Sequence, residues 1–175
     1  MRKNVLIFGG ILGIVMAAGA QYMALRCYNN PEHTSNDVVG WVGIFLVLSI
    51  LFVGIKNYRD KYNDGFISFG KAFKVGLYMS LVAATLYTVT WLVNYYLFIP
   101  DFEHQYVKHV LYMARQEGAT AAELAKKAKD MEAFTGMYQN PLFVALQTFS
   151  EVLLPSLPVI LISALILKRK PRMVL

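Results

Sequence analysis

Charged residues are scarce in this chain, and cysteine is almost absent. Of its 175 residues only 16% are charged and 57% are hydrophobic, whereas a soluble domain has about 25% charged residues. The single cysteine, Cys27, excludes an intramolecular disulfide framework. Together with a mean hydropathy of +0.44, these shortages predict an integral membrane protein.

The sequence also lacks the motifs that mark common enzymes and metal sites. It contains no HExxH zinc motif, no GxxxxGK[ST] phosphate loop and no GxSxG nucleophile elbow. Its histidines, His33, His104 and His109, lie outside the apolar runs, and the last two are five positions apart, a poor spacing for one helix face. We therefore expect no catalytic residues, no metal and no cofactor, and an envelope enzyme is the least favoured class.

Four long apolar runs make up most of the chain. About 20 apolar residues cross a bilayer as a helix, so we expect an all-α polytopic membrane protein, a four-helix bundle in one domain over residues 1–175. A helical hairpin is expected on the outer surface between the third and fourth spans. The predicted spans are residues 5–25, 38–55, 72–99 and 142–167, and the hairpin covers residues 102–140.

The first run has features of both a span and a signal peptide. Arg2 and Lys3 resemble an n-region, and Ala18-Gly19-Ala20 resembles a cleavage site. The run exceeds the usual h-region of roughly 7–15 residues, so we expect it to be retained. Small residues recur every four positions in the first and third runs and would allow close helix packing; these are Gly9, Gly13 and Ala17, and Gly76, Ser80, Ala84 and Thr88.

A basic loop between the second and third runs predicts the orientation. With both termini inside, the cytoplasmic segments hold 11 Lys and Arg and two acids, and the outer segments hold six Lys and Arg and eight acids. This distribution satisfies the positive-inside rule and predicts a multi-pass inner-membrane protein with cytoplasmic N- and C-termini. The charge favours anionic lipid headgroups over nucleic acid as partner. The candidate headgroup contacts are Lys56, Arg59, Lys61, Lys71 and Lys74.

The predicted hairpin shows helical periodicity in both arms. Phe102, Tyr106, Val110 and Met113 recur on one face, and Gly118 ends this helix. Thr120-x-x-Glu123 is a capping box that opens the second helix. Its apolar face is predicted to contain Leu124, Ala128, Met131 and Phe134 or Thr135.

Glu151 is the one ionisable residue deep in an apolar run, and it defines the candidate site. It lies about 13 Å along the helix from Leu142, where an unpartnered charge is costly. Pro155 and Pro158 remove backbone hydrogen bonds from the carbonyls of Glu151 and Leu154. Polar residues at similar depth complete the predicted intramembrane site: Gln147, Thr90 and Asn94, with Tyr87 and Ser49 as further partners.

Two interpretations of this site stay open from the residues. A protonated Glu151 can hydrogen-bond a neighbouring helix and act as structural glue. Alternatively, the carboxyl group and the freed carbonyls can hold a proton, an ion or a substrate, as broken helices do in transporters.

Several motifs of the chain resemble the domain-of-unknown-function 4199 family. They are VGIKNYRDK at 53–61, ISFGKAFKVG at 67–76, FIPDF at 98–102, Asn140-Pro141, Glu151 with its prolines, and SALILKR at 163–169. The resemblance covers nearly the whole chain and implies a bacterial inner-membrane protein with about four spans and no assigned activity. The chain departs from the family at LPSLP, residues 154–158, where a single proline and a glycine are expected.

Two functions follow from these features. The favoured one is a non-enzymatic membrane protein that acts by association, as a homo-oligomer or as an accessory subunit of a larger complex. The alternative is a small ion- or proton-coupled transporter or lipid-handling protein built on Glu151 and the proline-containing fourth helix.

Overall fold

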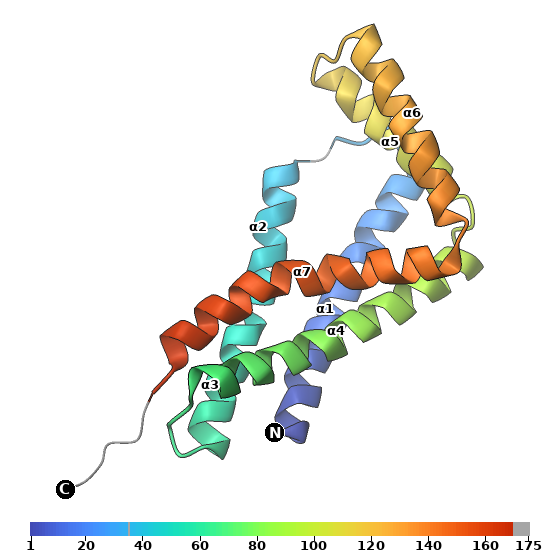
Figure 1. The fold of residues 1–175 in the computed structure, drawn as a ribbon. Coiled ribbons are helices and arrows are strands. Elements are labelled where there is room, and N and C mark those ends of the chain that lie inside the picture. The colour runs from blue at the N-terminus through green and yellow to red at the C-terminus, as the bar shows by residue number, and fades with distance from the viewer. Residues whose placement is uncertain (35, 170–175) are drawn as a thin grey trace, which may run out of the picture.

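The structure, a computed structural model, describes residues 1–34 and 36–169. Within these residues the chain is helical and forms no strand, apart from one isolated β-bridge. Figure 1 shows the helices and their order. They are α1 (Arg2–Asn29), α2 (Asp37–Leu48), α3 (Ile50–Tyr62), α4 (Phe69–Leu97), α5 (Phe102–Gln116), α6 (Ala121–Tyr138) and α7 (Pro141–Leu167).

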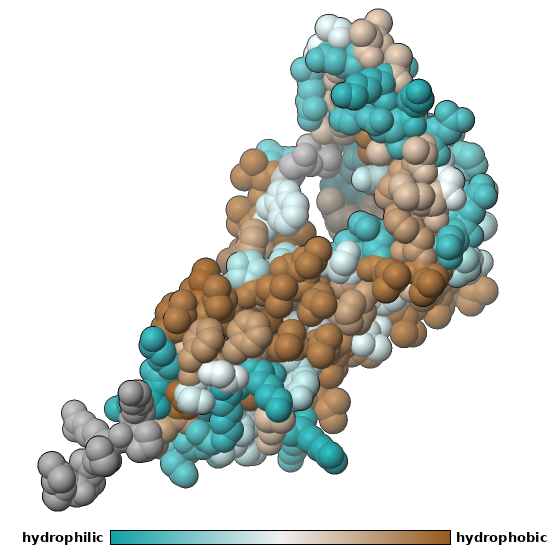
Figure 2. Space-filling model, viewed as in Figure 1, coloured by the Kyte–Doolittle hydropathy of each residue, from teal (hydrophilic) through white to brown (hydrophobic). Residues whose placement is uncertain are grey.

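Four segments are long and apolar enough to cross a membrane, which confirms the predicted class of membrane protein. Hydrophobic residues cover the middle of the molecule, while hydrophilic residues gather on the hairpin and at the opposite end (Figure 2). The four segments are Arg2–Asn29, Val38–Tyr62, Phe69–Leu97 and Pro141–Leu167.

The second candidate span, Val38–Tyr62, runs through Ser49, where α2 meets α3. The Ser49 hydroxyl donates a hydrogen bond of 2.6 Å to the carbonyl of Leu46. The helical backbone bonds continue on both sides: the Ser49 N–H lies 3.1 Å from the Phe45 carbonyl, and the Val53 N–H lies 3.3 Å from the Ser49 carbonyl. Helices α2 and α3 therefore form one candidate span, and α2 stands away from α1 in Figure 1.

Helix α4 packs against α1 on one side and α7 on the other. Small residues permit the close approach of α1: a Cβ atom on Gly9 would lie 2.7 Å from the Met79 carbonyl oxygen, and one on Gly13 3.0 Å from the Ala83 Cα. Gly76 is similarly enclosed by Ile55 and Ile160. The glycines of both predicted stripes therefore pack inside the chain.

A buried polar contact joins α1 to α3. The Asn4 side chain is 2% exposed, and its amide donates a hydrogen bond of 3.0 Å to the Gly54 carbonyl. A glycine at this position leaves the carbonyl accessible to a neighbouring helix. The contact links the start of the chain to the helix that precedes the basic loop.

Helix α7 contains both internal prolines and stays helical through them. Figure 1 shows that it changes direction part-way along its length. The Ser156 and Ser163 hydroxyls donate hydrogen bonds of 2.6 Å to the carbonyls four residues earlier, those of Val152 and Val159. The prolines therefore bend α7 without ending it.

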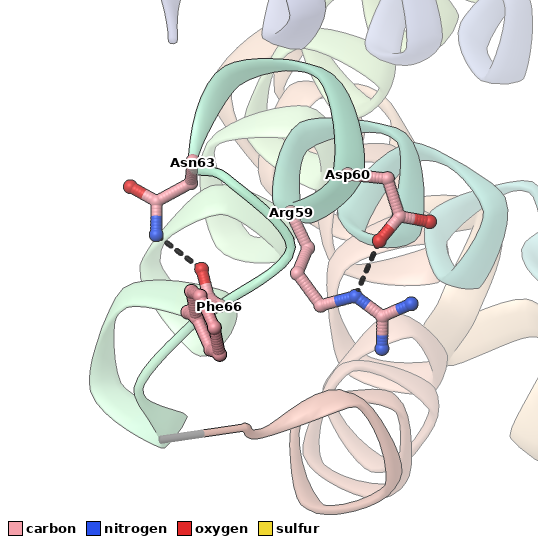
Figure 3. Close-up of polar contacts among 4 residues, drawn as sticks. All are labelled: Arg59, Asp60, Asn63 and Phe66. Atoms are coloured by element: carbon pink, nitrogen blue, oxygen red, sulfur yellow. Dashed lines mark hydrogen bonds and ion pairs between the residues drawn. The ribbon is translucent and has the colours of Figure 1, made fainter. Parts of the chain in front are cut away.

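The five basic residues predicted to lie in a loop are on α3 and α4, and the connection between these helices is residues 63–68. This connection folds back onto the end of α7. Ile67 and Arg169 form an antiparallel bridge with backbone bonds of 3.1 and 2.8 Å. Arg59 pairs with Asp60 at 2.6 Å, and the Asn63 amide donates to the Phe66 carbonyl (Figure 3). Of the predicted basic C-terminal stretch, residues 170–172 lie outside the described residues.

Helices α5 and α6 pack against each other as the predicted pair, joined by a short connection. Gly118 has a φ of +86°, which is available to glycine at little cost and ends α5. The capping box of Thr120 and Glu123 is present in both directions. The residues of the two predicted apolar faces are all half-buried.

Candidate functional site

A cavity of about 470 Å³ lies where the α5–α6 hairpin meets the candidate spans, and Figure 2 shows the surface hollowed beneath the hairpin. Ligand pockets usually range from about 300 to 1,000 Å³. Helices α1, α4, α5, α6 and α7 and the α1–α2 connection form its wall. The lining residues are Ala20, Met23, Ala24, Cys27, His33, Tyr87, Trp91, Phe102, Glu103, Tyr106, His109, Phe134, Tyr138, Gln147 and Glu151.

Glu151 and Gln147 project from α7 into this cavity. They are one helical turn apart and therefore share a face of the helix. From α4, the Tyr87 hydroxyl donates a hydrogen bond of 3.3 Å to the Glu151 carboxyl group. The structure thus places the predicted site residues Glu151 and Gln147 together, and Tyr87 of the neighbouring candidate span α4 is the hydrogen-bonding partner of Glu151.

The other predicted site residues lie outside this wall. Thr90 lines a smaller hollow beside it and donates a hydrogen bond of 2.9 Å to the Leu86 carbonyl of its own helix. Asn94 is 5% exposed and lies about 10 Å further along α4 than Tyr87. Pro155 and Pro158 are absent from the described lining, so they shape α7 without contributing to the wall.

Aromatic rings form a continuous part of the wall. The Trp91 and Phe102 rings meet edge to face at 5.1 Å between centroids, and Phe134 and Tyr138 lie 4.6 Å apart. Tyr106 bridges the two pairs, at 5.9 Å from Phe102 and 6.4 Å from Phe134. From the sequence, Phe102, Tyr106 and Phe134 were predicted only to lie on the apolar faces of the hairpin helices.

Tyr138 closes the aromatic series at the end of α6. Burial, followed by the negative charge of the Glu151 carboxylate, raises the pKa of its phenol. The phenol therefore stays neutral and presents an uncharged ring to the cavity. Trp91 and Tyr95 of α4 pack against Tyr138 and the neighbouring rings of the hairpin.

A second carboxyl group enters the cavity from the hairpin. Glu103 lies in the first turn of α5 and accepts a hydrogen bond of 2.8 Å from the Tyr95 hydroxyl. Tyr95 is 5% exposed and belongs to α4. The bond fixes the hairpin carboxyl group to a candidate span and so orients it at the cavity.

A stacked histidine pair holds the α1–α2 connection against α5. The His33 and His109 rings lie 4.2 Å apart and nearly parallel, at 4°. The Nδ1 atom of each lies 2.8 Å from a backbone carbonyl, that of Asn30 and that of Pro31 respectively. Each Nδ1 therefore carries the proton, and the pair closes the cavity where α1 ends.

The described residues contain no group of three or more His, Cys, Asp or Glu side chains arranged to hold a metal ion. Cys27, the single cysteine, is buried in the cavity wall, and its thiol is directed to the Gln105 carbonyl at 4.0 Å. The polar groups of the cavity are thus two carboxyl groups, an amide, phenols and a histidine pair. This set can bind and orient a ligand through charge and hydrogen bonds.

Comparison with known proteins identifies the family of this chain. A sequence profile described as "Protein of unknown function (DUF4199)" matches residues 7–169. The chain belongs to the DUF4199 family. This match confirms the resemblance seen in the motifs and covers the hairpin, the last three candidate spans and all but the first residues of the first span of this DUF4199 protein. No curated protein and no solved structure matches the chain.

Proposed function

We propose that this DUF4199 protein is a non-enzymatic protein of the bacterial inner membrane that binds a small molecule beneath its hairpin. The observation that carries the proposal is the position of Glu151. An ionisable group deep in a membrane helix is costly, and this one faces a cavity of ligand size beside a phenol donor. The arrangement supports the alternative derived from the sequence, a site built on Glu151.

The proposed orientation places this cavity toward the outer surface. The N-terminus, the loop before α4 and the end of α7 lie at one end of the molecule, and the hairpin lies at the other (Figure 1). The basic residues that the positive-inside rule assigns to the cytoplasm lie at the same end as this loop, on α3 and at the start of α4. N- and C-termini are accordingly cytoplasmic in the proposal, and the hairpin is extracytoplasmic.

The basic end is proposed to contact anionic lipid headgroups. Lys56, Lys61 and Lys74 are exposed there, and exposed lysines beside a bilayer attract anionic lipids. Arg59 and Lys71 are already engaged, with Asp60 and Asn63 respectively. Lys71 is exposed as well, but its ammonium group donates to Asn63, so we assign the headgroup role chiefly to Lys56, Lys61 and Lys74.

Association with another membrane chain is a second candidate function. It rests on α2, whose apolar side chains are widely exposed, from Val38 at 70% to Phe45 at 46%. The glycines of the small-residue stripes offer no support, because they pack against helices of the same chain. A homo-oligomer or an accessory subunit would therefore use α2.

Trp91 provides a reporter for the proposed binding. The chain has two tryptophans, and Trp41 lies on exposed α2, so Trp41→Phe leaves a single tryptophan in the cavity wall. The full chain in dodecyl maltoside would be titrated with benzyltrimethylammonium, benzyl alcohol and benzenesulfonate. We expect at least one to change Trp91 emission saturably.

A matched pair of α1 variants tests whether the cavity is responsible. Ala20 lines the cavity and Ala18, two positions earlier, is exposed. Ala20→Phe should fill the cavity and abolish the response, and Ala18→Phe should preserve it. Absence of any saturable response, or a response that survives Ala20→Phe, refutes the proposed binding function.

A further inference from the structure

The charges around the cavity are of one sign. Among its described lining residues there is no lysine or arginine, and there are two glutamates, Glu103 and Glu151. They come from different elements, α5 and α7, and each is oriented by a tyrosine hydroxyl of α4. Glu103 is half-buried and Glu151 is exposed toward the cavity, so a cation that enters the cavity is attracted by both carboxyl groups.

The apolar part of the wall is also suited to positive charge. Trp91, Phe102, Tyr106, Phe134 and Tyr138 follow one another around the cavity at centroid distances of 4.6 to 6.4 Å. Aromatic faces attract organic cations, most strongly where water is excluded. An inorganic ion would use the carboxyl groups but leave these rings without a role.

We propose that the ligand is a small organic cation, an alkylammonium group on an apolar body, bound between the two carboxyl groups and the aromatic series. The cavity volume of about 470 Å³ accommodates a molecule of this kind. Anions are disfavoured by Glu103 and Glu151, and a neutral molecule would leave both carboxyl groups uncompensated. The assignment rests on the proposed binding function and names its ligand class.

The three probes of the Trp91 titration separate the two proposals, because they share an aromatic ring and differ in charge. Benzyltrimethylammonium is permanently positive, so its charge does not change with pH. The maltoside headgroup of the detergent is uncharged, so it does not compete with the cation for charge pairing with the carboxyl groups. We expect it to bind about tenfold or more tighter than benzyl alcohol. Benzenesulfonate should bind more weakly still.

Charge-neutral variants then test whether the carboxyl groups of Glu103 and Glu151 bind the cation. Glu151→Gln and Glu103→Gln keep the side-chain shape and should each weaken the cation about tenfold or more, since a desolvated charge pair is broken. Benzyl alcohol affinity should change by less than about twofold, because no charge pairing is lost. Glu132→Gln, at an exposed position on α6 away from the cavity, is the matched control and should leave both affinities unchanged.

The possible outcomes distinguish the binding proposal from the cation assignment. If benzyl alcohol or benzenesulfonate binds as tightly as the cation, the cavity is a binding site but the cation assignment is wrong. If none of the probes binds, both proposals fall. If the cation binds equally well to Glu151→Gln and Glu103→Gln, the carboxyl groups are not its partners and the assignment is overturned.

Discussion

Single atoms decide how closely α1 approaches α4. Two adjacent glycines of α1 differ in the space around them. A Cβ atom added to Gly9 would collide with the Met79 carbonyl oxygen, whereas a Cβ atom added to Gly10 would meet nothing within 4 Å. The small-residue pattern in the sequence predicts such a contact, and the structure identifies α4 as the partner. The pattern could not supply that partner, because every span offers small residues.

Gly9→Ala should lower the free energy of unfolding by about 1–3 kcal/mol, the usual cost of overpacking a close contact. The neighbouring Gly10→Ala is the control and should leave stability unchanged or raise it by up to about 1 kcal/mol through helix propensity. Unfolding by SDS titration in mixed micelles measures both. Equal losses for the two variants would contradict the close α1–α4 contact.

Helices were the most predictable elements of this chain. The cap at Thr120, the start at Asn140-Pro141 and the end at Gly118 all depend on neighbours within a few residues, so the sequence carries them directly. The predicted span 38–55 corresponds to the candidate span Val38–Tyr62, which extends past the apolar run because the helix continues through the basic residues that follow it.

The capping box of α6 should make the first turn of this helix sensitive to acid. Bonds from the Thr120 backbone N–H and then its hydroxyl lower the pKa of Glu123 below the ordinary 4.5. A depressed folded-state pKa contributes stability that is present above about pH 4.5 and is lost as the pH falls through the lowered value. Hydrogen-exchange protection of residues 121–124, corrected for intrinsic rates, should fall over that range.

Glu123→Gln supplies the control for this acid sensitivity. The variant keeps the amide as a hydrogen-bond acceptor but cannot titrate, so protection of the first turn should become independent of pH. A wild-type profile that matches that of the variant between pH 3 and pH 6 would show that the cap does not titrate in this way.

At the scale of the whole molecule, the sequence predicted the membrane class and one cavity helix but not the cavity. Glu151 stood out because it is the lone ionisable residue in an apolar run, and Gln147 followed from helical spacing. Glu103, His33 and Trp91 come from separate segments, and only tertiary packing brings them together. Asn94 is buried on α4 and is not among the described lining residues of the cavity.

The proposed orientation has a direct test with single cysteines. Starting from Cys27→Ser, Ala125→Cys places a thiol at an exposed position of α6 and Lys61→Cys places one at an exposed position near the end of α3. A membrane-impermeant maleimide should label the α6 cysteine in intact spheroplasts and the α3 cysteine only after lysis. Labelling of the α3 cysteine in intact spheroplasts would invert the proposed topology.

The composition of the cavity wall also dictates an order of events during synthesis. Helices α1 and α4 and the hairpin emerge from the ribosome first, and Gln147 and Glu151 arrive with α7, the last helix to be made. Until then Tyr87 has no carboxyl partner, and the aromatic series faces an open side. The proposed ligand site is therefore completed only once α7 has been made, and a chain arrested within the hairpin carries three candidate spans without a complete cavity wall.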